Sequence, residues 1–431
     1  MAPAPGLLMP WLGATSWQDV PYVDPVGVAT ALWRTGGDLV WLDSAAGGMH
    51  VMGLGDATLV VRGDEATRDG ERVPGDALDA LHAAAMSGGA WVGWLGYEAG
   101  ARLLGVDAPT GRHPDAAWLR LSTWLVVDDD ARRAQLQSRH ATPEPLPVPE
   151  TPPWFGDAPR ASVRWRDDPE AYLAAIAACQ ARIRDGDSYL LCLTTMVVTG
   201  PIDPLATYLR LRATTRAHHG GLLRVDGTTL ASASPERFLR VEGGRVRTSP
   251  IKGTRRRGSG ADDAALAEEL RTSEKERAEN VMIVDLCRND LQRVCEPGSV
   301  AVTSLLAVET YPTVHQLVST IEGTLREGVA PVDVVRATFP AGSMTGAPKR
   351  RTVELLQGLE TGPRGVYAGC FGVVTADACD LAMVIRSIVA DEDGATIGVG
   401  GGITALSVPE EELDEVALKA EALVRALVPL A

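Results

Sequence analysis

The feature that most constrains the fold is a β-hairpin near the middle of the chain. Thr229–Val241 and Arg245–Ile251 are both predicted to be strands, and only the turn residues Glu242-Gly243-Gly244 separate them. Strands joined by so short a turn run antiparallel. A turn centred near Gly244 places Glu236 opposite Lys252, and a one-residue change in loop length makes the pair diagonal. In either register a carboxyl group and an amine lie close together at one end of the hairpin.

Lys252 is held in a short stretch that restricts the backbone on both sides. Pro250 fixes its own φ and Gly253 permits tight backbone geometry, so the lysine between them has a defined support. A partly desolvated lysine can lose its proton and act as a nucleophile. The plainer interpretation is a solvated lysine before the basic run Arg255-Arg256-Arg257, and these few residues alone favour that interpretation.

The chain changes character after about residue 141. Residues 1–141 alternate short strand-like runs with turns, and the following segment from Thr142 to Pro153 holds six prolines. Such a segment is typical of an extended linker. We therefore expect an N-terminal region over 1–141, a linker over 142–160 and a second domain over 161–431. A linker inside one composite fold would look the same.

The second domain mixes helical and strand patterns. One long helix is expected over Asp262–Leu291, and another follows the capping-box pattern Ser407-x-x-Glu410. Strands are expected over Val366–Thr375 and over Ala382–Ala390, the second of which contains Arg386. An arginine in an apolar strand needs a partner, which could be a bound carboxylate or a carboxylate of the protein.

Two pairs of glutamates have helical spacing. Glu276 and Glu279 share one helix face, as do Glu412 and Glu415, with Lys419 four residues further on the same face. Four carboxylates on two facing helices could hold Mg²⁺ with several waters retained. The alternative is two solvated helix faces, and the spacing alone favours that alternative.

Two glycine-containing segments could bind an anion through backbone N–H groups. The loop Gly342–Pro348 leads into a helix, and Gly400-Gly401-Gly402 follows a strand. The alternative is two ordinary turns, since neither matches a nucleotide-binding pattern.

Composition excludes several classes of function. The net charge is −15, which makes nucleic acid an improbable partner, and no stretch is long and apolar enough for a membrane span. The first residues lack the pattern of a signal peptide, and none of the six cysteines forms a C-x-x-C pair. We therefore expect a cytoplasmic protein in a reducing compartment, with no nucleic acid and no membrane as partner.

Five ordered motifs resemble those of the chorismate-utilising enzymes, the group that holds anthranilate, aminodeoxychorismate, isochorismate and salicylate synthases. They are Ser234-Pro235-Glu236, Pro250-Ile251-Lys252-Gly253-Thr254, Glu279-Asn280-x-Met282-Ile283-Val284-Asp285-Leu286-x-Arg288-Asn289-Asp290, Gly346-Ala347-Pro348-Lys349 and Gly400-Gly401-Gly402-Ile403. The match runs from about residue 165 to 425, and the N-terminal part is similar to that of the amidating members. The resemblance implies an α+β composite fold with two mostly antiparallel sheets packed as a sandwich and flanked by helices.

The lysine of the second motif distinguishes members of this group. Anthranilate synthases carry alanine at the position of Lys252, whereas lysine there resembles the first component of the aminodeoxychorismate synthases. The resemblance implies that Lys252 attacks C2 of chorismate, that Glu236 protonates the leaving C4 hydroxyl, and that ammonia then adds at C4. The product would be 4-amino-4-deoxychorismate, on the route to 4-aminobenzoate and folate. No glutaminase motif is present, so a glutamine amidotransferase subunit would supply the ammonia.

The resemblance also assigns the remaining site residues. The metal would be Mg²⁺, with Glu279 and Glu415 as principal ligands and Glu276 and Glu412 as supporting acids. The substrate chorismate would be held by five further residues, namely Tyr367, Arg386, Thr345, Gly401 and Lys419.

Two positions depart from the family pattern. Leu190 replaces a polar residue whose lysine form serves as a base in water-adding members, which argues against that chemistry. Gln316, preceded by His315, replaces a histidine of anthranilate synthases, and the role of both residues stays open. The alternatives are an anthranilate or 2-amino-2-deoxyisochorismate synthase, or a binding paralogue without catalysis, which loss of the paired glutamates would have indicated.

Overall fold

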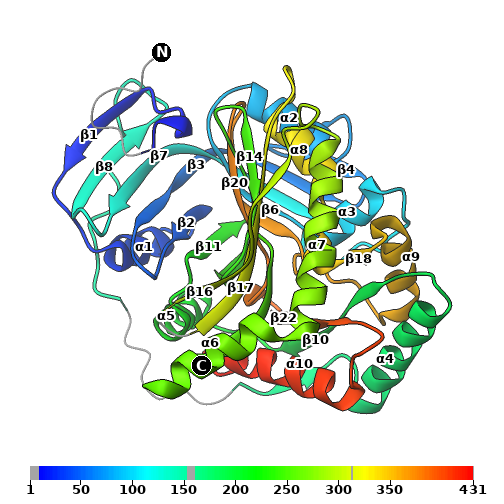
Figure 1. Cartoon of the computed structure of the whole chain (residues 1–431). Coiled ribbons are helices and arrows are strands. Elements are labelled where there is room, and N and C mark those ends of the chain that lie inside the picture. The colour runs from blue at the N-terminus through cyan, green and yellow to red at the C-terminus, as the bar shows by residue number, and fades with distance from the viewer. Residues whose placement is uncertain (1–8, 153–160, 312–313, 431) are drawn as a thin grey trace.

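The structure is a computed structural model that describes residues 9–152, 161–311 and 314–430. It confirms the α+β class, with helices placed around a network of strands (Figure 1). The described residues contribute 22 strands to this network. Every strand pairing within the described residues is antiparallel. Antiparallel pairing follows from the many short turns, because a tight turn can only reverse the chain.

Two long neighbouring strands connect the two halves of the network. They are β3 (Met49–Arg62) and β7 (Ala116–Asp128), which pair along almost their whole length. Four short strands extend these two at their outer ends, namely β1 (Ser16–Val20), β8 (Arg133–Ser138), β4 (Glu65–Arg68) and β5 (Glu71–Val73). The rest of the network leaves β7 and β3 in two directions, which we call the first and second wings.

The first wing starts at β7 and mixes N-terminal with C-terminal segments. In order of pairing it contains β6 (Trp91–Leu95), β19 (Cys370–Val374), β20 (Cys379–Met383), β13 (Arg237–Glu242), β14 (Arg245–Thr248) and β17 (Val314–Thr324), and it ends on β15 (Ile251–Arg256) and β16 (Ala301–Thr310).

The second wing starts at β3 and mixes the two parts of the chain in the same way. In order of pairing it contains β2 (Leu39–Asp43), β11 (His219–Val225), β12 (Thr228–Ser234), β21 (Ser387–Asp391), β22 (Gly394–Ile403) and β10 (Leu190–Thr199), and it ends on β9 (Val163–Trp165) and β18 (Gly346–Ala347).

The two wings face each other across a core built almost wholly from strand residues. This cluster contains Val40, Leu119, Leu223 and Phe371. The apolar side chains next to them in the same strands point to the opposite face and belong to the two outer cores. Successive side chains along a strand point to opposite faces of a sheet. Each wing therefore buries its inner face against the other wing and its outer face against helices. The arrangement is the predicted sandwich, with all its strands linked by hydrogen bonds into one network.

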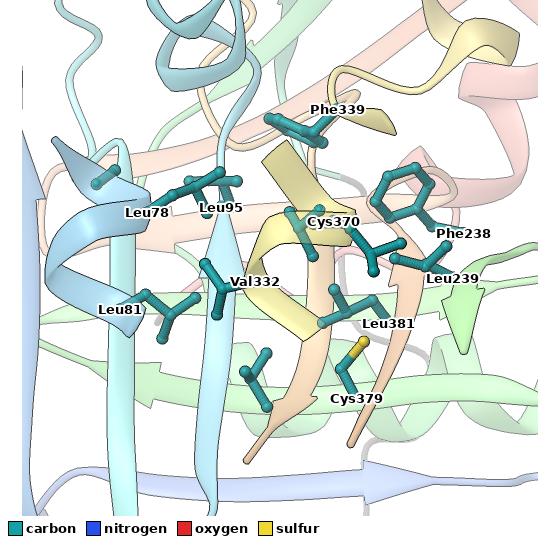
Figure 2. Packing of buried hydrophobic residues seen from close by; sticks show 14 of the residues in the cluster. Leu78, Leu81, Leu95, Phe238, Leu239, Val332, Phe339, Cys370, Cys379 and Leu381 are labelled. Atoms are coloured by element: carbon teal, nitrogen blue, oxygen red, sulfur yellow. The ribbon is translucent and has the colours of Figure 1, made fainter. Parts of the chain in front are cut away.

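Helices cover the two outer faces. The first wing is covered by α2 (Ala77–Met86), α3 (Tyr97–Leu103), α7 (Glu274–Gln292) and α8 (Pro331–Thr338). The second wing is covered by α1 (Pro25–Arg34), α4 (Pro169–Arg184), α5 (Pro204–Thr215), α9 (Lys349–Leu359) and α10 (Pro409–Val424). Figure 2 shows the outer core of the first wing, where Val332 of α8 lies between Leu81 of α2 and Leu381 of β20. None of the described helices is long and apolar enough to cross a membrane.

Several predicted elements are interrupted in the structure. The expected helix over Asp262–Leu291 is two helices, α6 (Ala261–Thr272) and α7, because Ser273 leaves helical geometry and caps the second with its hydroxyl. The expected capping box at Ser407 is wrong. α10 begins at Pro409 after Val408 without a side-chain cap, and the Ser407 hydroxyl instead accepts a hydrogen bond from the backbone of Thr404.

The proline-rich segment contains no helix or strand over its described part, residues 142–152, and residues 153–160 lie outside the described part of the structure. Strands from both sides of this segment pair directly, since β2 pairs with β11 and β6 pairs with β19. The division of the chain into separate domains at this segment stays a prediction.

Candidate active site

Two breaks in predicted strands place Glu236 and Arg386 between the wings. The strand expected over Thr229–Val241 is divided into β12 and β13, because Pro235 lacks the N–H group that a ladder needs. The strand expected over Ala382–Ala390 is divided at Arg386, whose φ of 52° is left-handed. Arg386 is therefore in a crossing segment and not inside a strand.

The two crossing segments are fixed to each other by backbone hydrogen bonds. Met383 donates to the carbonyl of Glu236 at 3.0 Å, and Ala233 donates to the carbonyl of Arg386 at 3.1 Å. Each segment carries the chain from one wing to the other, so both side chains lie where the wings meet. Neither position follows from local sequence periodicity.

The hairpin brings Glu236 and Lys252 together through the diagonal register. Its turn holds two residues, Gly243 and Gly244, both with positive φ, and Glu242 pairs with Arg245. Extending this register sets Glu236 level with Ile251, whose N–H donates to the Glu236 carboxylate. Lys252 is the next residue, and its charge acts on Glu236.

Lys252 is almost buried and lies beside Glu279 of α7. Its side chain is 13% exposed, and Nζ lies 3.9 Å from Oε2 of Glu279. Burial alone would lower the pKa of Lys252, but the charges of Glu279, Glu236 and Glu276 outweigh burial and raise the pKa above its usual value. Gly402 lies against the pair, since a Cβ on Gly402 would be 3.6 Å from Nζ of Lys252 and 3.4 Å from Oε2 of Glu279.

Glu236 has the environment of a carboxylic acid that stays protonated near neutral pH. Its side chain is buried, and the Ser343 hydroxyl donates to Oε1 at 2.9 Å. Burial raises the pKa of Glu236 to about 7, although Ser343 and the charge of Lys252 oppose that shift. Glu236 is therefore suited to proton donation, whereas the neighbouring Lys252 is held as an ammonium by the carboxylates and would need to lose its proton before it could attack a substrate.

The four predicted metal-binding glutamates lie where α7 meets α10, beside β10 and β22 (Figure 1). Each carboxylate is paired with a different cation. Glu279 lies 3.9 Å from Lys252, Glu276 is 3.3 Å from Arg255, Glu412 is 2.8 Å from Lys275, and Glu415 is 2.7 Å from Lys419. The glutamate spacing alone favoured two solvated helix faces. In the structure the four glutamates instead form a charge-balanced cluster with these cations.

The donor set of this cluster suits a hard divalent cation. Glu279 and Glu412 are buried, and burial together with the charges of Glu276 and Glu412 raises the pKa of Glu279. Among the described residues, no three histidine, cysteine or acidic side chains converge closely enough to hold a metal ion in this arrangement. The carboxylates fit Mg²⁺ in chemistry and number, and in this structure they contact cationic side chains instead.

Arg386 lies within electrostatic reach of Tyr367 and of Glu415 in the acidic cluster. Within the described part of the chain, Arg386 forms no ion pair, and burial lowers its pKa against the charges of Tyr367 and Glu415. Tyr367 is buried against Gly398, where a Cβ would lie 2.0 Å from the Tyr367 ring. Tyr367 belongs to a turn before β19 and not to the predicted strand. An arginine without a protein partner suits a bound carboxylate.

The three other predicted substrate residues differ in how they could act. Lys419 donates to the carbonyl of Gly400 at 2.8 Å while it pairs with Glu415. Gly401 lies in β22, where an added Cβ would be 3.2 Å from Glu412. Thr345 is fully buried, and its hydroxyl donates to the carbonyl of Ala341 at 3.1 Å. The triple glycine is thus part of strand β22, paired with β10, and not a turn.

The three residues at or beside the positions that depart from the family pattern lie near the site or on the strands next to it. Leu190 approaches the Lys252 site, since a Cβ on Gly402 would lie 3.2 Å from its Cδ1. His315 lies 2.9 Å from Asp263 of α6 and 2.9 Å from the Thr310 hydroxyl, so it joins α6 to the strands. Gln316 pairs in register with Thr254, two residues beyond Lys252.

Sequence reasoning missed Ser343, Arg255 and Lys275 as site residues. Ser343 was within a predicted loop, but its contact with Glu236 spans 107 residues of sequence. Lys275 could have been found from its position four residues before Glu279, which puts both on one face of α7.

Comparison with known proteins identifies the family. A family model described as "chorismate binding enzyme" matches residues 39–425. The chain therefore belongs to the chorismate-binding enzymes, as its motifs predicted. This membership covers most of the chain and includes strands of both wings.

Relatives within the family include aminodeoxychorismate synthases. That of Streptomyces pristinaespiralis is 45% identical over 362 residues, covering 78% of this chain and 50% of the relative. That of Streptomyces griseus is 44% identical over 363 residues, with 78% and 50% covered. This chain spans about half the length of these curated relatives.

A solved structure confirms the fold. The crystal structure of anthranilate synthase component I from Streptococcus pneumoniae TIGR4 superposes with a TM-score of 0.79 and 26% sequence identity. The similarity covers 89% of this chain and 94% of that one.

Proposed function

We propose that this chain is the chorismate-aminating component of an aminodeoxychorismate synthase, a transferase that forms 4-amino-4-deoxychorismate. The observation that carries the proposal is the placement of Lys252, whose amine lies 3.9 Å from Glu279 and next to the protonatable Glu236. The aminodeoxychorismate synthases among the relatives support this choice.

The proposed reaction uses Lys252 and Glu236 in sequence. Neutral Lys252 attacks C2 of chorismate, the ring double bonds shift, and the C4 hydroxyl leaves as water with the proton of Glu236. The Lys252 adduct returns a proton to the Glu236 carboxylate. Ammonia then attacks C4, the reverse shift breaks the bond between C2 and Nζ, and the proton lost by the new C4 ammonium is taken up by Nζ, which leaves as the neutral amine. Chorismate and ammonia are thus converted to 4-amino-4-deoxychorismate and water.

The acidic cluster would hold Mg²⁺ through Glu279 and Glu415, supported by Glu276 and Glu412. When bound, the metal ion would neutralise these carboxylates and receive the ring carboxylate of chorismate. Glu279 is the first of the charges that hold Lys252 protonated, so engagement of Glu279 would favour the neutral amine that attacks.

The enolpyruvyl carboxylate would be held by Arg386 and Tyr367. Arg386 has no ion-pair partner among the described residues, and its guanidinium can bind a carboxylate through two parallel hydrogen bonds. Lys419 and the backbone of Gly401 would lie around the substrate carboxylates. Thr345 would support the pocket wall, since its hydroxyl is already bonded to Ala341.

A separate glutaminase would supply ammonia in the proposed reaction. The support is that no cysteine of the given sequence stands in the G-x-C-x-G pattern of a glutamine amidotransferase nucleophile. A cytoplasmic location and a place on the route to 4-aminobenzoate and folate belong to the same proposal.

The test is to incubate the protein with chorismate, Mg²⁺ and a high concentration of ammonium salt and to measure product mass. We expect 4-amino-4-deoxychorismate. Release of anthranilate would favour an anthranilate synthase, a mass for 2-amino-2-deoxyisochorismate would favour that synthase, and binding of chorismate without turnover would favour a non-catalytic paralogue. Each of these three outcomes would contradict the proposal.

A further inference from the structure

We propose that Lys275 is a built-in counter-cation of the acidic cluster, which a divalent metal ion must displace from Glu412 when it binds. The inference rests on the proposed function in one respect, because it takes the four glutamates as the metal site. It adds an exchange between two states of the site, one closed by a lysine and one holding the metal ion.

Lys275 reaches across from α7 to α10. Its Nζ lies 2.8 Å from Oε1 of Glu412, whose side chain is only 3% exposed. The charges of Glu279 and Glu415 also act on Lys275, so its ammonium lies among three of the four carboxylates. The Lys275 ammonium therefore lies among the groups proposed to hold the metal ion.

The other three cations of the cluster are anchored where they are. Arg255 has two contacts to Glu269 of α6, at 2.6 and 2.9 Å, besides its contact to Glu276. Lys419 donates to the Gly400 carbonyl, and the Lys252 side chain is 13% exposed. Lys275 is the most exposed of the four, at 38%, and Glu412 is its one hydrogen-bond partner among the described residues. Lys275 can therefore leave at the smallest cost in contacts.

The residue type supports the same conclusion. The chain contains 41 lysines and arginines, of which only four are lysines, namely Lys252, Lys275, Lys349 and Lys419. Three of these four contact the carboxylates of the cluster. Arginine forms rigid bidentate pairs, whereas lysine is a compact point charge on a flexible stem, which can be exchanged for another cation.

The physical reason for such a residue is repulsion among the carboxylates. Several acidic groups in a partly buried site repel each other strongly when no cation is present. A mobile lysine relieves that repulsion in the metal-free protein, and it competes with the metal ion for the same oxygens. The metal affinity of the protein is then weaker than that of the carboxylates alone.

The first experiment measures metal affinity without turnover. Metal-free wild-type protein and Lys275→Met are titrated with Mn²⁺, free Mn²⁺ is read from its EPR signal, and Mg²⁺ affinity follows from competition. We expect Lys275→Met to bind both ions roughly tenfold more tightly, because one charge-assisted contact no longer competes. Arg277→Met removes the same charge from an exposed position two residues away, and we expect less than about a twofold change because solvent screens that charge.

A second measurement uses the unmodified protein. Four lysines give four resolvable signals when the protein carries ¹³C-labelled lysine, and Lys275→Arg identifies that of Lys275. We expect the Lys275 signal to shift and narrow as Mg²⁺ is added, because the side chain moves into solvent.

The outcomes separate this inference from the proposed function. The displacement is wrong, while the metal site is still supported, if Lys275→Met binds metal no more tightly than wild type and Arg277→Met. The same conclusion follows if the Lys275 signal does not change at saturating Mg²⁺. If wild-type protein binds neither ion, the metal assignment fails and the inference fails with it.

Discussion

At the scale of single residues, the site consists of groups whose proton affinities are set by their surroundings. Burial raises the pKa of Glu236 to about 7, while nearby carboxylates raise that of Lys252. Both groups are therefore protonated in this state below neutral pH. In the proposed reaction Glu236 would thus hold its proton before substrate arrives, and Lys252 would become neutral only when its carboxylate partners are neutralised.

Replacing Lys252 by alanine tests the nucleophile. We expect Lys252→Ala to lose amination at C4 by roughly a thousandfold or more, or to divert chorismate towards elimination products, because the covalent step is removed. Product mass and initial rate are measured with ammonium as the nitrogen source. Chorismate binding by calorimetry serves as the control for a folded site, and an unchanged product and rate would remove the nucleophile role.

The Glu236 carboxyl should make stability depend on pH. Its folded pKa of about 7 lies above its ordinary value, so wild type loses stability as pH rises from about 4.5 through about 7. Glu236→Gln does not titrate and can still accept from Ser343. We expect its Tm to exceed that of wild type at about pH 8, by the equivalent of about 3 kcal/mol, and to match it at about pH 4.

Thermal unfolding of both proteins across that range is the measurement. Ser343→Ala removes a hydrogen bond that lowers the pKa of Glu236 but keeps the titrating group, so its stability should fall with rising pH at least as much as that of wild type. A Tm difference between Glu236→Gln and wild type that does not change with pH would contradict the raised pKa.

At the scale of elements, the glycines of strand β22 provide the surface against which the side chains of the site pack. Tyr367 packs against Gly398, Glu412 packs against Gly401, and Lys252 and Glu279 pack against Gly402. The distances leave little space for a side chain at these glycines. The glycine run thus serves close packing of functional side chains against a strand, because no Cβ separates them.

A side chain at Gly398 should disturb both packing and binding. A Cβ there would lie 2.0 Å from the Tyr367 ring, so Tyr367 must move. We expect Gly398→Ala to lose about 1–3 kcal/mol of unfolding free energy and to bind chorismate more weakly. Gly358→Ala in α9 is the control, since its Cβ would meet nothing within 4 Å, and it should be neutral or gain up to about 1 kcal/mol. Equal stability of the two variants would contradict the close packing.

At the scale of the whole molecule, the N-terminal strands are structural partners of the strands that carry the candidate site. Both wings continue across the linker, and the core between the wings takes residues from both sides of it. The buried carboxylate of Glu98 in α3 accepts from the backbone N–H groups of Arg364 and Gly365, while the Arg364 guanidinium donates to the carbonyls of Met344 and Cys192. The loop that carries Ser343 is thus tied to the N-terminal region.

We therefore expect residues 161–431 alone to fail to fold into a stable unit. Without residues 1–141, strands β11 and β19 lose their partners β2 and β6, and the core between the wings is open on one side. Expression of the fragment, followed by size-exclusion chromatography and thermal unfolding, should give aggregates without a cooperative transition. Co-expression with residues 1–141 should restore soluble protein, and a monomeric fragment with a cooperative transition would show a separable domain.

The sequence by itself determined the family and, for the most part, the kinds of elements. The order of Glu236, Lys252 and the four glutamates indicated the family, and most helices and strands followed local periodicity. It did not reveal the breaks at Pro235 and Arg386 as crossings between wings, the pairing of each glutamate with its own cation, or the sharing of both wings across the linker. Local patterns record which face of an element is apolar, whereas these features depend on contacts between residues far apart in the chain. Only the tertiary structure decided that Lys275 stands among the carboxylates.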